Sequence, residues 1–172
     1  MLFRSGIELT LERFSSRGWY LMFTASLFES KYRGSDDIWR NTLFNSNFVF
    51  NWVGGYEIPI TRNHSISFDI KSVWAGGLRK LPIDLDASIA RGRTVYDYSN
   101  AFASRYGDYF RFDFKASFKF NLRHVSQVLA LELINSTNRK NHFIETFNPT
   151  LSQIEESTQL GLTPLVMYRI VF

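Results

Sequence analysis

The chain has 172 residues and no cysteine, which excludes a disulfide scaffold and a thiolate metal site. Its net charge of +4 comes from intermixed acidic and basic residues without a basic block, so no nucleic-acid partner is expected. No segment approaches the roughly 20 consecutive apolar residues that a membrane helix needs. If this chain crosses a membrane, we therefore expect it to cross with β-strands.

Seven segments predict long β-strands. In each of them apolar residues concentrate at every second position, and residues of one parity lie on one face of a strand. In chain order the segments are 6–14, 19–32, 45–58, 65–76, 108–121, 127–138 and 158–172. The chain is therefore expected to be all-β and antiparallel.

The segment from Tyr109 to Asn121 has the most regular alternation. One parity consists of Phe110, Phe112, Phe114, Ala116, Phe118 and Phe120, and the other consists only of polar residues. Strands of globular proteins are mostly about 5–6 residues long, whereas a tilted membrane-spanning strand needs about 9–11. Length and pattern together favour lipid contact for the phenylalanine face.

The links between these segments alternate between short and long. Short links are expected near residues 15–18, 61–64 and 122–126, and long links at about 33–44, 77–107 and 139–157. Short periplasmic turns and long outer loops are typical of outer-membrane barrels. The first strand is then expected to run toward the periplasm, and Phe172 to lie at the periplasmic rim.

An odd number of strands does not complete a bacterial barrel, which has an even number when it is closed. Unpaired strand edges would also leave backbone groups without hydrogen-bond partners in lipid. In addition, Met1 to Ser5 are not followed by the apolar core of a secretory signal. We therefore expect this chain to be a fragment that lacks upstream strands and its export signal.

Several segments resemble, in their order along the chain, a single protein family. Residues 105–113 read RYGDYFRFD, residues 133–138 read LINSTN, and residues 159–172 read QLGLTPLVMYRIVF. They resemble the motifs RYPDYFRLDL, NVTN and QLGLxPxxxYRIEF near the end of many TonB-dependent outer-membrane receptors, especially those of Bacteroidetes-type bacteria. Residues 34–42 (GSDDIWRNT) and 54–57 (GGYE) extend the resemblance over nearly the whole chain.

This resemblance implies a parent with an N-terminal plug inside a 22-stranded barrel in the bacterial outer membrane. In that family the plug takes force from the inner-membrane TonB complex, and the transporter takes up a nutrient such as a siderophore or an oligosaccharide. Residues 1–172 would then be one domain, the C-terminal part of an antiparallel transmembrane β-barrel, with the plug absent. The implied partners are outer-membrane lipid, the barrel-assembly machinery, and the missing plug and strands.

The last strand resembles the signal that the barrel-assembly machinery reads. Tyr168, Ile170 and Phe172 occupy alternate positions, and an aromatic strand end can pair by edge addition. The alternative is a lipid-facing strand with an aromatic residue at the membrane interface.

Charged residues of the polar parity are expected to face the barrel lumen, because an Arg or Lys on the lipid face costs roughly 2–4 kcal/mol at the bilayer midplane. These residues are Glu8, Glu12, Asp69, Lys71, Arg111, Asp113, Lys115, Lys119 and Glu132. Two roles stay open for them: contact with a plug or a permeating substrate, or a hydrated wall held by cross-strand ion pairs.

Candidate ligand-binding residues lie in the long links at 33–44 and 77–107, because function concentrates in loops mounted on a rigid scaffold. They are Asp36, Asp37, Trp39, Arg40, Arg91, Arg93 and Tyr96. This mixture of charged and aromatic groups suits a sugar or an iron chelate. The alternative is that these loops only shield the mouth of the barrel.

Neither a metal, a cofactor nor an enzymatic activity is expected. His64, His124 and His142 lie far apart in the sequence and lack the spacing of metal ligands.

Two other functions are kept as alternatives. An outer-membrane barrel enzyme would need a histidine beside an acid or a serine at the outer rim, for which His142 is the only candidate. A soluble β-barrel binding module would instead pack the phenylalanine stripe from Phe110 to Phe120 in a core.

Overall fold

The computed structural model describes the backbone of residues 1–172 and the side chains of all of them except Ser16. Its long strands are β1 (Leu2–Ser16), β2 (Trp19–Arg33), β4 (Phe48–Pro59), β5 (His64–Ala75), β6 (Tyr109–Asn121), β7 (Ser126–Ile134) and β10 (Thr163–Val171). They lie side by side in the order β1-β2-β4-β5-β6-β7-β10, and each neighbouring pair is antiparallel. The prediction of an all-β, antiparallel chain with seven long strands is confirmed.

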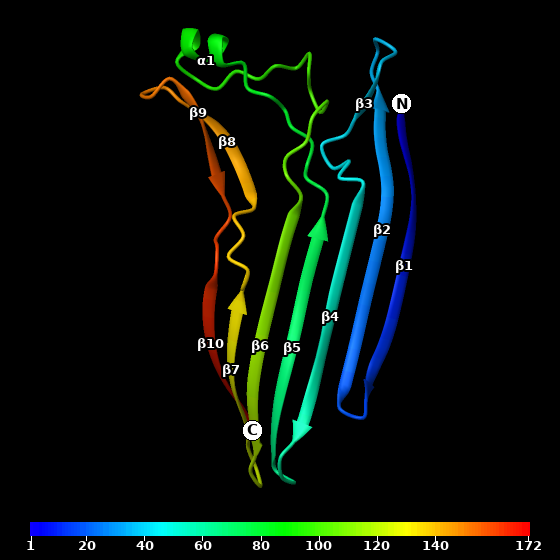
Figure 1. Ribbon diagram of the computed structural model, residues 1–172, viewed down its shortest axis with the longest axis vertical. Coiled ribbons are helices and arrows are strands. Elements are labelled where there is room, and N and C mark those ends of the chain that lie inside the picture. The colour runs from blue at the N-terminus through cyan, green and yellow to red at the C-terminus, as the bar shows by residue number, and fades with distance from the viewer.

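The main sheet is one layer thick, with its long connections gathered at one end (Figure 1). The major contacts between elements join only strands that are neighbours in a sheet. The short connections at 17–18, 60–63 and 122–125 lie at the lower end in Figure 1, and the long connections lie at the upper end. The predicted alternation of short and long links is therefore confirmed.

Additional elements lie within the long connections. The strand β3 (Trp39–Asn41) pairs with the end of β2, and the helix α1 (Leu85–Arg91) lies between β5 and β6. Between β7 and β10, β8 (His142–Asn148) and β9 (Gln153–Thr158) form a separate antiparallel hairpin. The link at 139–157 is long as expected, but it contains this hairpin, which was not predicted. The strand expected to begin at residue 158 begins at Thr163, because Thr158 still belongs to β9.

Local capping explains α1, which the poor periodicity of its segment did not indicate. Asp84 at the N-cap accepts a hydrogen bond from the backbone N–H of Ala87 at 2.9 Å, and Gly92 ends the helix with a left-handed φ of 63°. Asp86 lies in the first turn and Arg91 in the last, where the helix dipole favours each charge. None of the described helices is both long and apolar enough to span a membrane.

The strand register separates apolar and charged residues onto opposite faces of the sheet. Phe114 of β6 lies across from Leu133 of β7, whereas Lys115, the next residue of β6, lies across from Glu132. The same alternation continues through the neighbouring strands because their pairing has no register shift from β2 to β10. One face therefore carries rows of apolar side chains, and the other carries most of the charged ones.

The apolar face has no second layer packed against it. Among the described side chains, the buried apolar ones are only Ala130 and Phe147, which are 2% and 7% exposed. Large apolar residues on this face, such as Leu129 and Val166, are instead well exposed. The two edge strands, β1 and β10, do not pair with each other, so the sheet is open.

The long connection after β5 begins with a close backbone approach. A Cβ added to Gly77 would collide with the backbone carbonyl oxygen of Tyr106, and one added to Gly76 would collide with that of Ser46. The two ends of the 76–108 connection can therefore lie side by side only because residue 77 has no side chain.

We predict that Gly77→Ala lowers the free energy of unfolding by about 1–3 kcal/mol, because the added methyl group must push two backbone segments apart. Urea unfolding followed by tryptophan fluorescence measures this change. Gly107→Ala is the matched control, because a Cβ there meets nothing within 4 Å, and its effect should stay within about 0.5 kcal/mol. Equal effects of the two substitutions would contradict a role for the close approach.

Candidate functional site

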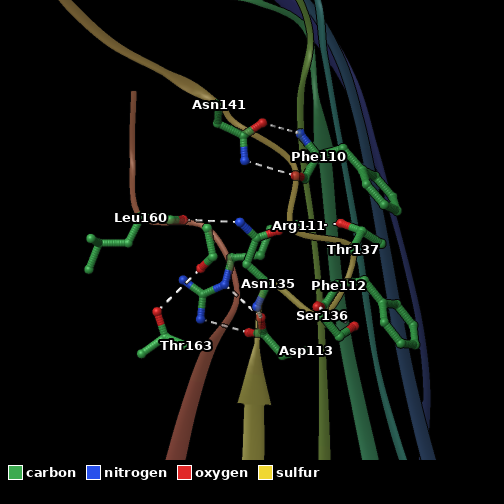
Figure 2. A network of polar contacts seen from close by, with 11 residues as sticks. Phe110, Arg111, Phe112, Asp113, Asn135, Ser136, Thr137, Asn141, Leu160 and Thr163 are labelled. Carbon is green, nitrogen blue, oxygen red and sulfur yellow. Dashed lines mark hydrogen bonds and ion pairs between the residues drawn. The ribbon is translucent and has the colours of Figure 1, made fainter. Parts of the chain in front are cut away.

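A buried polar network lies where β6 and β7 reach the loop end of the sheet (Figure 2). Asp113 and Asn135 are each 3% exposed, and Asn141 is 4% exposed. The carboxylate of Asp113 accepts two hydrogen bonds of 2.7 Å from the Arg111 guanidinium and one of 2.8 Å from the backbone N–H of Asn135. A buried carboxylate needs such partners, because an unpaired buried charge is strongly destabilising.

Asn135 turns the chain out of β7. Its φ of 51° lies in the left-handed region, which asparagine tolerates better than most residues. Its side-chain amide donates hydrogen bonds to the carbonyl oxygens of Arg139 at 2.9 Å and Leu160 at 3.0 Å. One side chain thus holds the segment that leaves β7 against the segment that leads into β10.

Asn141 takes the place of a neighbouring strand beside β6. The pairing of β6 with β7 reaches only to Phe114, so the backbone of Phe110 lies beyond it. The Asn141 side chain accepts a hydrogen bond from the Phe110 N–H at 3.0 Å and donates one to the Phe110 carbonyl at 2.8 Å. Because Asn141 directly precedes β8, this pair of bonds fixes where β8 begins.

The network places β8 beside the 76–108 connection and brings together Lys80, Tyr106, His142, Glu145 and Glu156, which we call the loop-end cluster. The rings of His142 and Tyr106 stack with centroids 3.4 Å apart, and His142 Nδ1 lies 2.8 Å from a Glu156 oxygen. Glu145 accepts hydrogen bonds of 3.1 Å from both the Tyr106 hydroxyl and the Lys80 ammonium. Lys80 also lies 4.3 Å from the centre of the Tyr106 ring, within cation–π range.

Electrostatics keep Tyr106 in its neutral form. Burial raises the pKa of the Tyr106 phenol, and the negative charge of Glu145 and the hydrogen bond to it raise the pKa further. The phenol is protonated at neutral pH in any case, and the raised pKa keeps it a hydrogen-bond donor to Glu145 at more alkaline pH as well.

A cavity of about 380 Å³ opens beside the loop-end cluster. Tyr96, Tyr106, His142 and Glu145 line part of it, and apolar side chains such as Leu78 line the remainder. Pockets of this kind bind ligands through apolar contact and orient them through a few polar groups. Aromatic rings beside a carboxylate suit a small polar ligand that also has an apolar face, such as a sugar ring.

Of the candidate ligand-binding residues in the 77–107 link, the structure places only Tyr96 at this cavity. Arg91 lies in the last turn of α1, and Arg93 follows the helix; both are exposed. Their charges therefore point to solvent at the loop end and do not join the loop-end cluster.

The candidates in the 33–44 link form a separate group near β3. Arg40 forms an ion pair with Asp36 at 2.7 Å, and Arg33 forms one with Asp37 at 3.0 Å. The hydrogen bond from Arg40 lowers the pKa of the Asp36 carboxyl. Trp39 is exposed beside this group. These charges are already paired with one another, which favours a structural role for this turn.

All residues predicted to face a lumen share the charged face of the sheet: Glu8, Glu12, Asp69, Lys71, Arg111, Asp113, Lys115, Lys119 and Glu132. The register sets Lys71 across from Asp113, and it sets Lys115 between Asp69 and Glu132. Opposite charges on neighbouring strands stabilise a sheet modestly. That this face lines a lumen stays a prediction.

The residues of the expected assembly signal lie at the turn end of β10. Tyr168 and Ile170 are on the apolar face, and the Tyr168 hydroxyl donates a hydrogen bond of 2.6 Å to Gln127 of β7. Phe172 follows the strand and is 94% exposed. This placement fits an assembly signal and an interfacial aromatic residue equally, so the signal stays a prediction.

Four members of the loop-end cluster were not predicted from the sequence: Lys80, Tyr106, Glu145 and Glu156. A signal for part of it exists, because the dipeptide at 148–149 (NP) favours a turn, which could join the two strands of a hairpin. That hairpin would have set Glu145 near Glu156. Lys80 and Tyr106 reach the hairpin through a long connection, which no local pattern reveals.

No protein-family model, curated protein or solved structure matches this chain. Membership in the TonB-dependent receptors therefore stays a hypothesis that rests on the resembling segments.

We predict that Asn135→Ala lowers the free energy of unfolding by about 2–4 kcal/mol. The substitution removes the two side-chain hydrogen bonds to Arg139 and Leu160. It also places alanine, whose side chain cannot form local hydrogen bonds, at a positive φ. Asn135→Gly removes the same bonds but tolerates the backbone conformation, so it should cost about 1–2 kcal/mol less. Urea unfolding of both variants measures the difference. Unchanged stability in both would contradict the role of Asn135 in holding the loops.

Proposed function

We propose that this chain forms part of the wall and outer loops of a bacterial outer-membrane β-barrel transporter of the TonB-dependent type. The observation that carries the proposal is the exposed apolar face of a single-layer sheet. A sheet with one apolar face must bury that face against another element or against lipid. Here no described element covers it.

The energies favour lipid as the cover. Removing one Leu, Ile, Val or Phe side chain from water is worth about 1.5–3 kcal/mol, and this face presents rows of them on seven strands. The long strands have 9 to 15 residues, which meets the length of about 9–11 that a tilted membrane strand needs. The charged face would then line an aqueous lumen.

The open edges of the sheet support a larger barrel. In lipid, each unpaired backbone group on β1 and β10 would cost several kcal/mol, so further strands would have to pair with both edges. The resemblance implies such strands, because the barrel of that family has 22 of them. They surround a plug on which the TonB complex exerts force. The barrel-assembly machinery would insert the barrel, guided by the aromatic end of β10.

The loop end supports a role in nutrient capture. The cavity beside Tyr106 combines aromatic rings with charged groups and lies on the end that would face the outside of the cell. A siderophore or an oligosaccharide would meet this end first. Uptake through a barrel of this kind is therefore the function that the fold and the resemblance support best.

One observation favours an enzyme. His142 lies 2.8 Å from Glu156, which is the histidine–acid pair that an outer-membrane hydrolase would need. In the described part of the chain, however, neither ring nitrogen of His142 is hydrogen-bonded to a serine or threonine hydroxyl. A soluble binding module is disfavoured because its apolar face would have to be a packed core, and this face is exposed.

We predict that spin labels at Phe114 and Phe118, in the full-length gene product reconstituted into lipid, are accessible to oxygen and shielded from a water-soluble nickel complex. Labels at Lys115 and Lys119, the next residue of the same strand in each case, should show the opposite preference. Power-saturation electron paramagnetic resonance measures both accessibilities. Oxygen preference at the lysine positions, or no difference between the two parities, would overturn the membrane proposal.

We also predict that deleting this gene abolishes growth of its host on at least one member of a panel of ferric siderophores and oligosaccharides supplied as the sole iron or carbon source. The intact gene should restore growth. A variant in which two glycines replace residues 85–94 should restore it less well. The ends of that excursion already meet, because Ile83 bridges to Tyr96 and Asp84 N–H bonds to Val95.

Surface display of the shortened variant is the control for that experiment. The chain has no cysteine, so a single cysteine at the exposed Tyr98 can be labelled on intact cells with a membrane-impermeant maleimide. Normal growth of the deletion strain on every compound would refute transport. Normal growth of the shortened variant at normal display would assign α1 to shielding alone.

A further inference from the structure

The loop-end cluster contains a set of groups that can hold a metal ion. One ligand atom each from His142, Glu145 and Glu156 lies within 4.8 Å of the other two. Zinc is bound by histidine nitrogen and carboxylate oxygen at about 2.0–2.2 Å, so ligands around one ion lie about 3–4 Å apart. Small rotations of the two glutamate side chains would bring the three ligand atoms from within 4.8 Å of one another to that separation.

A β-bulge gives His142 its place in this set. Residues three apart on a regular strand lie on opposite faces, so His142 and Glu145 would normally point apart. The pairing of β8 with β9 shifts between His142 and Ile144, and His142 lies across from Thr158 while Ile144 lies across from Ser157. The extra residue, Phe143, restores His142 to the face of Glu145. Bulges often re-aim a side chain next to a functional site.

The register also sets two negative charges against each other. Glu145 lies directly across from Glu156, and like charges in directly opposed positions destabilise a β-hairpin. In this structure Lys80 lies 3.1 Å from Glu145, and His142 lies 2.8 Å from Glu156. A hairpin built only for stability would not need this pair, whereas a dication between the two carboxylates would stabilise it.

Neighbouring groups orient the ligands. The Tyr106 hydroxyl donates a hydrogen bond to Glu145 and its ring stacks on His142. Asn141, bonded at both ends to the backbone of Phe110, fixes the start of β8. Such outer contacts hold ligands in position and tune metal affinity.

We propose that His142, Glu145 and Glu156 bind a divalent first-row transition metal, with zinc as the probe. An imidazole ligand disfavours Mg²⁺ and Ca²⁺, which take oxygen ligands. Three protein ligands leave a further coordination position for water or for a donor atom of a molecule in the adjacent cavity. Metal binding here goes beyond the transport proposal and does not depend on the membrane location.

Isothermal titration of the purified full chain with zinc chloride tests this site. We expect one saturable site, which Mg²⁺ and Ca²⁺ do not compete for. Glu156→Gln, which keeps the shape of the side chain, and His142→Ala should each weaken zinc binding by about tenfold or more. The control is His64→Ala, at the start of β5 and at the opposite end of the sheet, which should leave the affinity unchanged.

Two further measurements keep the test decisive. X-ray absorption of the zinc-loaded chain should show one imidazole with oxygen ligands. Because this measurement uses the unchanged chain, its result does not depend on how well a variant folds. Lys80→Met should raise the zinc affinity, because the ammonium of Lys80 competes for Glu145. The proposal is overturned if the unchanged chain has no saturable site, if His142→Ala and Glu156→Gln both bind normally, or if only Lys80→Met binds zinc. That last result would make Lys80 the resident cation of the cluster.

Discussion

A sheet that is one strand thick has no interior, and this constraint governs the molecule. Backbone hydrogen bonds tie each long strand to its neighbours. Every side chain of these strands points to one of the two faces of the sheet, and neither face is covered by a second layer. Nothing in the described chain packs on the apolar face, and buried apolar side chains are almost absent. The surroundings of the protein must therefore supply what a core supplies elsewhere. Whichever medium covers the apolar face also decides what the charged face meets.

The same constraint explains why buried polar groups lie at the rim. Along the strands, backbone groups are satisfied by the sheet itself. Where β6 outruns β7, the ladder ends and side chains have to take its place. Asn141 completes the pairing of Phe110, and Asp113 accepts the backbone N–H of Asn135. These substitutes for a missing strand hold the segment that follows β7 against β6 and make the loop end a defined structure.

The loop end concentrates chemistry that the strands do not. Lys80 and Tyr106 come from one connection, and His142, Glu145 and Glu156 come from the hairpin in another. Their meeting combines a neutral phenol, an ammonium, an imidazole and two carboxylates beside one cavity. A rigid sheet that carries such loops is a common arrangement for binding, because the scaffold fixes the positions that the loops present.

The sequence by itself determined the strands, their antiparallel order and the two faces. A period of two over nine or more residues is a local signal, so every second residue from Phe110 to Phe120 could be assigned to one face without knowing the fold. Short turns also make the strands that they connect neighbours in the sheet. Tertiary structure alone decided the loop-end cluster. Helix α1 depends on capping by Asp84 and Gly92 in a segment of poor period, and the hairpin of β8 and β9 is too short for a clear pattern. Above all, His142 reaches the face of Glu145 through a one-residue bulge. A shift of that size reverses the parity of a side chain, and parity was the information on which the sequence-based assignment depended.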